Sequence, residues 1–181
     1  MEHGFADTTM LDIATRARVS KRELYALVGN KEEMLEACIA GRGGRMHLPE
    51  GYAPPTDRAG VQAALRQFGA TMLRELLEPN VIAAFRLGIA EARRSPAIAR
   101  SIDARGRQPA RARLRELLEH ARDLRLLGNA DLAEMTSMFR ALLLGDVMVW
   151  VLLGLDKAPT AKEIDVRAER AAVIFMNTYG R

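Results

Sequence analysis

The chain has 181 residues, of which 49% are hydrophobic and 28% are charged, and its formal net charge is +4. This composition provides enough apolar side chains for a normal buried core. No apolar run reaches the roughly 18–20 residues that a membrane span needs, and three acidic groups in residues 2–12 exclude a signal peptide. The one cysteine, Cys38, excludes an internal disulfide and fits a reducing compartment. We therefore expect a cytoplasmic protein with no membrane partner.

Residues 9–35 have the pattern of two short helices joined by a tight turn, followed by the start of a third helix. Apolar side chains recur at helical spacing on both sides of the turn, namely Ile13, Ala14 and Ala17 before it and Leu24, Leu27 and Val28 after it. Ser20, with Glu23 three residues later, is a capping box that starts the second helix. This layout predicts a helix-turn-helix, whose second helix enters the major groove of DNA.

The rest of the chain is predicted to be helical as well, because apolar side chains recur at helical spacing and no strand pattern occurs. Glycine and proline are frequent in residues 41–56, which predicts a loop. The expected helices cover residues 56–78, 80–94, 96–106, 110–127, 130–153 and 161–179, with a weak point near Gly106 and a new start at Pro109. We predict an all-α fold, with a helix-turn-helix head in residues 1–42 and a helical domain in residues 43–181.

The residue pattern over positions 4–32 is more specific than that of a generic helix-turn-helix. It contains Gly4-Phe5, Thr8-Thr9, Ile13-Ala14, Val19-Ser20-Lys21, Leu24-Tyr25 and Asn30-Lys31-Glu32, with no gap over about thirty residues. In these residues the chain resembles the TetR family of bacterial transcription regulators. The resemblance implies a helical homodimer whose N-terminal domain binds a palindromic operator and whose C-terminal domain binds a small inducer.

A second set of residues is similar to the AefR-type C-terminal domain found in part of that family. The set comprises residues 80–94 followed by Ser95-Pro96, residues 131–134 and 139–146, and the Leu153-Gly154 helix end. Together the two resemblances cover most of the chain.

Three features depart from the family pattern. The family has a full helix before the Gly-Phe pair, whereas Met1 stands three residues before Gly4 here. Arg18 stands at a turn position that is usually glycine, where a left-handed conformation costs about 1 kcal/mol. Val28 stands where the family has an aromatic residue.

The first helix would cover apolar side chains of the next two, and each buried aliphatic side chain contributes about 1.5–3 kcal/mol. Two explanations remain open at this point: the natural start lies upstream, or the head is impaired.

The resemblance and the residue types together predict the DNA-binding residues. We expect Lys21, Arg22 and Glu23 to face bases, whereas Thr9, Tyr25 and Lys31 hold phosphates. Arg18 and Ser20, at the turn, complete the set. The leading hypothesis is a dimeric, ligand-responsive repressor with double-stranded DNA as partner. The alternative is a TetR-like helical protein that binds a small molecule or dimerises while its DNA-binding head is impaired.

The helical domain is expected to hold a small apolar or aromatic ligand and the dimer interface. The predicted ligand-binding residues are Phe68, Met72, Phe85, Ile89, Met138, Asp146 and Trp150. Ser137, Ala141 and Gly145 recur every four residues and form an edge of small side chains that allows two helices to approach closely. Together with Phe175 and Tyr179, this edge is the predicted interface between two copies of the chain.

Enzymatic motifs are absent from the sequence. The three histidines are scattered, with no metal-ligand spacing, and no Gly-x-Ser-x-Gly, dinucleotide-binding or Cys-x-x-Cys motif occurs. We expect no metal, no cofactor and no catalytic residue. Basic groups gather between Arg93 and Arg125, ten arginines against four acids. A solvated helix face is the simpler interpretation of this cluster, and a second DNA contact is the alternative.

Overall fold

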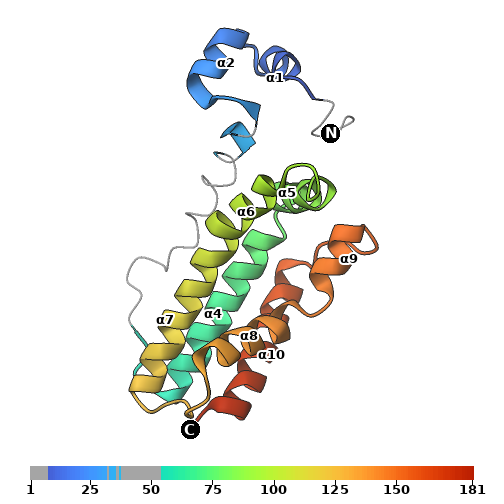
Figure 1. Ribbon diagram of the computed structural model, residues 1–181. Coiled ribbons are helices and arrows are strands. Elements are labelled where there is room, and N and C mark those ends of the chain that lie inside the picture. The colour runs from blue at the N-terminus through green and yellow to red at the C-terminus, as the bar shows by residue number, and fades with distance from the viewer. Residues whose placement is uncertain (1–7, 32, 36, 38–53) are drawn as a thin grey trace. The chain divides into compact units, whose positions relative to one another are not determined.

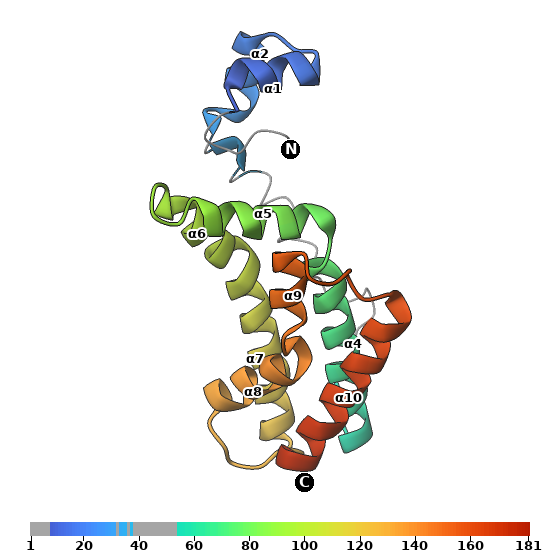
Figure 2. The same cartoon turned by 90° about the vertical axis from the view of Figure 1, so that its right-hand side faces the viewer.

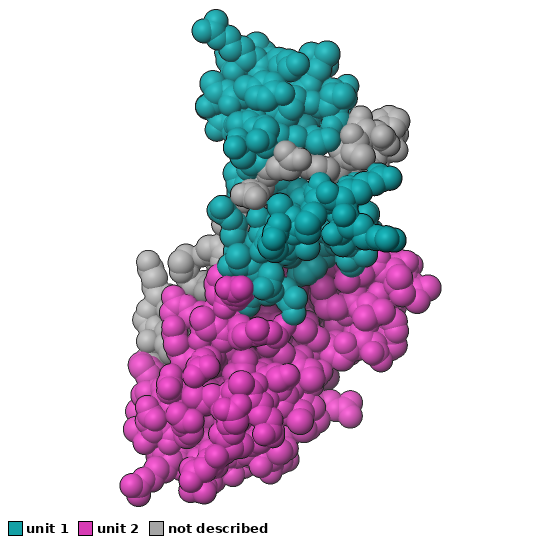
Figure 3. Space-filling view, viewed as in Figure 1, with its two compact units in different colours: residues 1–45, 83–107 teal, residues 46–82, 108–181 magenta. Residues whose placement is uncertain are grey.

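The computed structural model describes residues 8–31, 33–35, 37 and 54–181, and Figure 1 shows its helices in chain order. Every regular element of this part of the chain is a helix, apart from one isolated bridge between Leu127 and Gly180. The prediction of an all-α fold is therefore confirmed. The chain divides into two compact units, which Figure 3 shows in different colours. Unit 1 comprises Met1–Arg45 and Ala83–Arg107, and unit 2 comprises Met46–Ile82 and Gln108–Arg181.

Unit 2 is a layered bundle of helices. Its elements are α4 (Arg58–Leu76), α7 (Gln108–Asp123), α8 (Leu132–Leu144), α9 (Val147–Leu153) and α10 (Ala161–Tyr179). α10 packs mainly along α4 and also against α8, while α7 packs against α8 and α4, as can be followed in Figure 2. The side of α10 that carries Ile164, Ala168 and Ala171 is buried in this bundle.

The core of unit 2 is organised around Phe139 of α8. Its ring meets Phe175 edge to face at 5.7 Å between centroids and lies 6.4 Å from the ring of Phe68. Gly69 of α4 allows this approach, because an added Cβ would lie 3.0 Å from Leu143 and 3.4 Å from Phe139. Edge-to-face aromatic pairs of this kind add about 0.5–1.5 kcal/mol beyond the area that they bury.

The single helix predicted over residues 130–153 is wrong, because α8 and α9 are separate helices bent by 52°. Gly145 ends α8 with φ +44, and its N–H donates to the Ala141 carbonyl at 3.0 Å. Arg167 of α10 donates to the Leu143 carbonyl at 3.4 Å, in the last turn of α8. Gly145 is therefore a helix terminus rather than part of a continuous small-residue edge.

The second segment of unit 1 contains α5 (Pro79–Ala90, which begins in unit 2), α6 (Pro96–Ile102) and η1 (Asp103–Arg107), a single wide π-helical turn. The predicted weak point near Gly106 is confirmed by η1. Pro109 explains it, because a proline has no N–H to donate and its ring clashes with the carbonyl four residues earlier, that of Arg105. The helix widens there instead of ending, as π-turns inside α-helices do.

Several predictions lie mostly outside the described residues, namely the helix over residues 30–41, the loop over residues 41–56 and the thiol of Cys38. In the described part of the chain, no single helix has the length and apolar character of a membrane span. The pair α8 and α9 would reach that length and composition only if taken together across its 52° bend.

Candidate nucleic-acid interface

The first segment of unit 1 contains the predicted helix-turn-helix. Its helices are α1 (Met10–Ala17) and α2 (Lys21–Val28), which pack on each other through a cluster of three buried side chains, Met10, Ala14 and Leu24. Ile13, Val19, Val28 and Met34 are partly buried against this cluster. Of the head predicted over residues 1–42, the structure describes residues 8–31, 33–35 and 37, and from here on the head means these residues.

The turn between the two helices has the expected left-handed residue. Arg18 has φ 56 and ψ 38, and the next N–H, that of Val19, donates to the Ala14 carbonyl at 3.1 Å. A left-handed residue followed by this long-reach bond ends a helix sharply. The chain can therefore start α2 three residues after Arg18, although arginine is less favoured than glycine at this φ.

Ser20 and Glu23 form the predicted capping box of α2. The Ser20 N–H donates to Glu23 Oε2 at 2.8 Å, and the Glu23 N–H donates to Ser20 Oγ at 3.1 Å. The Ser20 hydroxyl, and then its backbone N–H, hold the pKa of the Glu23 carboxyl below its ordinary value. The carboxylate of Glu23 is therefore engaged at the helix start, whereas we had expected it to face a base.

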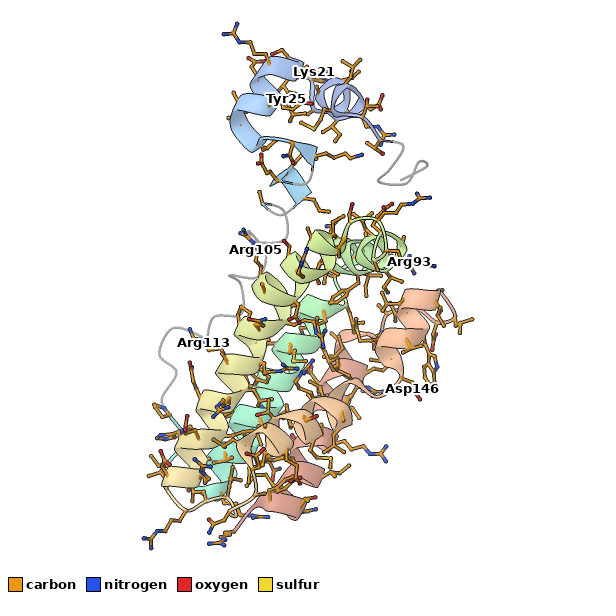
Figure 4. The ribbon with its side chains drawn as sticks, viewed as in Figure 1. Lys21, Tyr25, Arg93, Arg105, Arg113 and Asp146 are labelled. Carbon is orange, nitrogen blue, oxygen red and sulfur yellow. The ribbon has the colours of Figure 1, made fainter. Side chains whose placement is uncertain are left out.

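Lys21, Arg22 and Tyr25 lie on the exposed side of α2. The Lys21 Nζ atom lies 5.8 Å from the centroid of the Tyr25 ring, one helical turn away, which is a cation–π distance. Figure 4 shows both side chains on this helix. The Tyr25 side chain is 45% exposed, so its hydroxyl is available to a partner. A capped helix start with two cations and a phenol is suited to bind a phosphodiester backbone and base edges.

Thr9 and Lys31 lie together at the start of α1. Thr9 caps this helix through a second capping box, in which its own N–H donates to Asp12 at 2.8 Å. Lys31 donates to the carbonyl of Thr8 at 2.9 Å. These bonds place an ammonium group beside the N-terminus of α1, where the helix dipole also favours an anion.

Two side chains of the predicted apolar stripes are on the surface instead. Leu27 is 76% exposed and Ala17 is also exposed. The reason is geometric: α2 has only eight residues, and Leu24 and Val28 already occupy the side that meets α1. Leu11, which the sequence did not single out, is likewise 59% exposed.

The predicted ligand-binding residues of unit 2 differ in burial. Phe68 and Met72 are buried in the core, whereas Met138 and Trp150 are 40% and 44% exposed. Asp146, expected in an apolar helix, is exposed at the break between α8 and α9, as Figure 4 shows. In unit 1, Phe85 is half-buried and Ile89 is 63% exposed.

The predicted dimer residues also divide into two groups. Phe175 is fully buried and Tyr179 is 9% exposed, and both pack in the core of a single chain. The Tyr179 hydroxyl donates to Glu134 at 3.0 Å; burial, followed by this carboxylate, raises the pKa of the phenol. The structure therefore removes Phe175 and Tyr179 from the exposed face. Ser137, Ala141 and Gly145 are exposed.

Comparison with known families agrees with the geometry of the head. Residues 1–38 match the model described as bacterial regulatory proteins of the tetR family. Residues 63–181, well over half of the chain, match the C-terminal domain of AefR-like transcriptional repressors. The chain belongs to the TetR family. Members of this family are transcription regulators that bind DNA and act as dimers, and they are not enzymes. No protein of curated function matches the chain.

Solved structures of TetR regulators resemble the chain over nearly its whole length. A regulator from Agrobacterium tumefaciens is 28% identical, with a TM-score of 0.78 over 95% of this chain and 84% of its own. The flavonoid-responsive regulator FrrA is 30% identical, with a TM-score of 0.75 over 99% of this chain and 90% of its own. A regulator from Pseudomonas syringae pv. tomato, 22% identical, shares the fold with a TM-score of 0.73, over 99% and 89% of the two chains.

Proposed function

We propose that this TetR-family regulator is a cytoplasmic, dimeric repressor that binds a palindromic operator through α2 and releases it when a small ligand binds. The observation that carries the DNA-binding part is the doubly capped helix-turn-helix, which presents Lys21, Arg22 and Tyr25 on one exposed side. Two copies related by a two-fold axis would place their α2 helices about 34–36 Å apart, one turn of B-DNA.

The DNA contact is tested by selecting sequences from a random pool and footprinting the best one. Arg22→Ala should weaken binding to the selected sequence by about 1–3 kcal/mol and relax its preference at one position. Tyr25→Phe removes only a hydroxyl and should weaken all sequences alike. Arg115→Ala, an exposed arginine of α7, is the control for charge. Selection of no sequence by the wild type would favour the alternative, a TetR-like ligand-binding or dimerising protein with an impaired head.

The proposed dimer uses the exposed sides of the last three helices. They carry Ser137, Met138 and Ala141 on α8, Val149, Trp150 and Leu153 on α9, and Val166 and Ile174 on α10. Trp150 is the strongest candidate, because large aromatic side chains at the centre of an interface contribute most to binding. Trp150 and Val166 therefore replace Phe175 and Tyr179 in our account of the interface.

Light scattering at several concentrations tests this interface. Val166→Glu or Trp150→Glu should give a monomer, whereas Leu124→Glu, at a similarly exposed position of α7, should stay a dimer. Gly145→Leu is a poor test, because φ +44 and Arg167 at 3.3 Å from the added Cβ strain the fold of the single chain as well. If Val166→Glu and Trp150→Glu both dimerise as tightly as the wild type, the proposed interface is wrong.

The ligand class is supported by the 30% identical regulator, whose name describes a response to flavonoids. We propose a small aromatic ligand in the helical domain, whose binding changes the separation of the two α2 helices. A thermal-shift screen with flavonoids and simpler aromatic acids tests this. A stabilising compound should also release the selected DNA; stabilisation without release would contradict the switch.

A further inference from the structure

The positive charge of this protein is concentrated in one short segment. Residues 83–107, which we call the arginine segment, contain six arginines and two acids. The arginines are Arg86, Arg93, Arg94, Arg100, Arg105 and Arg107. The remaining 156 residues contain 21 basic and 21 acidic side chains. The net charge of +4 therefore equals the excess of this segment, which is formed by the end of α5, α6 and η1.

The arginines of this segment are directed to solvent while its acids compensate little of their charge. All six are exposed. One acid, Glu91, is 9% exposed, and the other, Asp103, makes an ion pair with Arg107 at 3.5 Å. In unit 2, by contrast, arginines lie beside acids from neighbouring turns and helices, as in the pairs Arg66–Glu169, Arg74–Asp165 and Arg113–Glu116. In unit 2 the basic and acidic side chains are equal in number, whereas the arginine segment has four more basic than acidic side chains.

The arrangement suits an extended polyanion rather than a small one. Figure 4 shows Arg93 and Arg105 well apart from each other, so these two guanidinium groups do not converge on one point. A guanidinium group holds a phosphate through two parallel hydrogen bonds and stays charged at every physiological pH. Phosphates repeated along a nucleic acid backbone match such a spread of arginines.

We propose that the arginine segment binds the phosphate backbone of DNA, as a second contact in addition to α2. This inference rests on the proposed DNA-binding function. Residues 1–45 contain seven basic and seven acidic side chains, so the helix-turn-helix region by itself adds no net attraction to a polyanion. Phosphate contacts supply sequence-independent affinity and accelerate association. The arginine segment provides this term, and α2 provides the sequence preference.

The salt dependence of binding tests the proposal. Arg93, Arg94 and Arg100 are replaced together by glutamine, and the control replaces Arg111, Arg113 and Arg115 of α7, which removes the same charge. Binding to a long random-sequence duplex is followed by fluorescence anisotropy between about 50 and 200 mM salt. Each lost phosphate contact lowers the slope of log K against log salt by about 0.9. We expect a drop of about 2–3 in the first variant and little change in the control.

Two outcomes overturn the inference: an unchanged slope in the first variant, or an equal drop in the control, which would show an effect of net charge alone. The failure of the proposed function is distinguishable, because then the wild type would select no DNA sequence. Arg22→Ala provides the complementary result, since it should relax the preference for the selected sequence at one position and keep most of its affinity for random DNA.

Photo-crosslinking shows whether the contact is direct. A benzophenone side chain at Ala97, which is exposed on α6, should crosslink to the duplex. The same group at Ala112, exposed on α7, should not. A crosslink from position 97 to protein but not to DNA would overturn the proposal and indicate an acidic protein partner instead.

Discussion

The head and unit 2 are held together in different ways. Among the described residues, the head buries three side chains in its core, whereas the main cluster of unit 2 contains 25. The head depends on local devices, namely two capping boxes, a similar reciprocal pair of hydrogen bonds between Asn30 and Glu33, and one left-handed turn residue. Unit 2 depends on contacts between helices that are far apart in sequence, such as α4 with α10. The head is therefore a small, locally specified element that can present DNA-binding side chains, while most of the buried apolar side chains lie in unit 2.

The largest expected effect is in the core of unit 2. Phe139→Ala removes the ring that contacts both Phe68 and Phe175 and should lower the free energy of unfolding by about 3–5 kcal/mol. Leu124→Ala, at a 45% exposed position of α7, is the control and should cost much less. Urea denaturation followed by circular dichroism measures both. Equal costs would show that the aromatic cluster does not dominate the stability of unit 2.

In the head, a smaller loss of unfolding free energy should have a larger consequence, because its core is small. Leu24 is 7% exposed and is one of three buried side chains there, so Leu24→Ala should cost about 2–3 kcal/mol. Amide hydrogen exchange should then lose protection in the head while unit 2 keeps it. Leu27→Ala, one turn away and 76% exposed, should change neither. Loss of protection in both units would mean that they unfold together.

Arginines in left-handed conformations offer a matched comparison of the two regions. Arg18 in the head has φ 56 and Arg125 in unit 2 has φ 59. Glycine avoids the steric cost of this conformation, so each Arg→Gly change should stabilise its own region by about 0.5–1 kcal/mol. Hydrogen exchange should show slower opening of the head in Arg18→Gly and of unit 2 in Arg125→Gly. Destabilisation by either change would show that the arginine makes contacts that outweigh the strain.

The smallest expected effect is a pH dependence shared by both regions. The capping boxes Ser20–Glu23 and Thr160–Glu163 lower the pKa of their glutamates below the ordinary value of 4.5. Because the folded pKa is depressed, the stabilisation is present above pH 4.5 and is lost as the pH falls through the folded pKa. Titration followed by NMR should place the pKa of both carboxyls below 4.5. Ser20→Ala should return the pKa of Glu23 to its ordinary value and leave that of Glu163 unchanged.

Much of the head could be predicted from sequence because its determinants are local. Capping boxes join residues three apart, and a left-handed turn residue acts on the carbonyls of the preceding turn, so the capping box of Ser20 and Glu23 and the turn at Arg18 were predicted correctly. The limits of α10 were predicted from helical spacing alone, and the structure shows that Thr160 and Glu163 form a capping box at its start. The resemblance in residues 4–32 identified the family because these local signals occur together at fixed spacing.

The sequence by itself determined the all-α fold, the helix-turn-helix and the family, since helical periodicity and capping depend on neighbours within a turn. Only the tertiary structure decided which apolar side chains of each helix are buried and which are exposed. It placed Phe175 and Tyr179 inside one chain, left Trp150 and Leu27 at the surface and divided the helix predicted over residues 130–153 at Gly145. The physical reason is that burial depends on which helix packs alongside, and periodicity shows that a helix has an apolar side without showing what covers it.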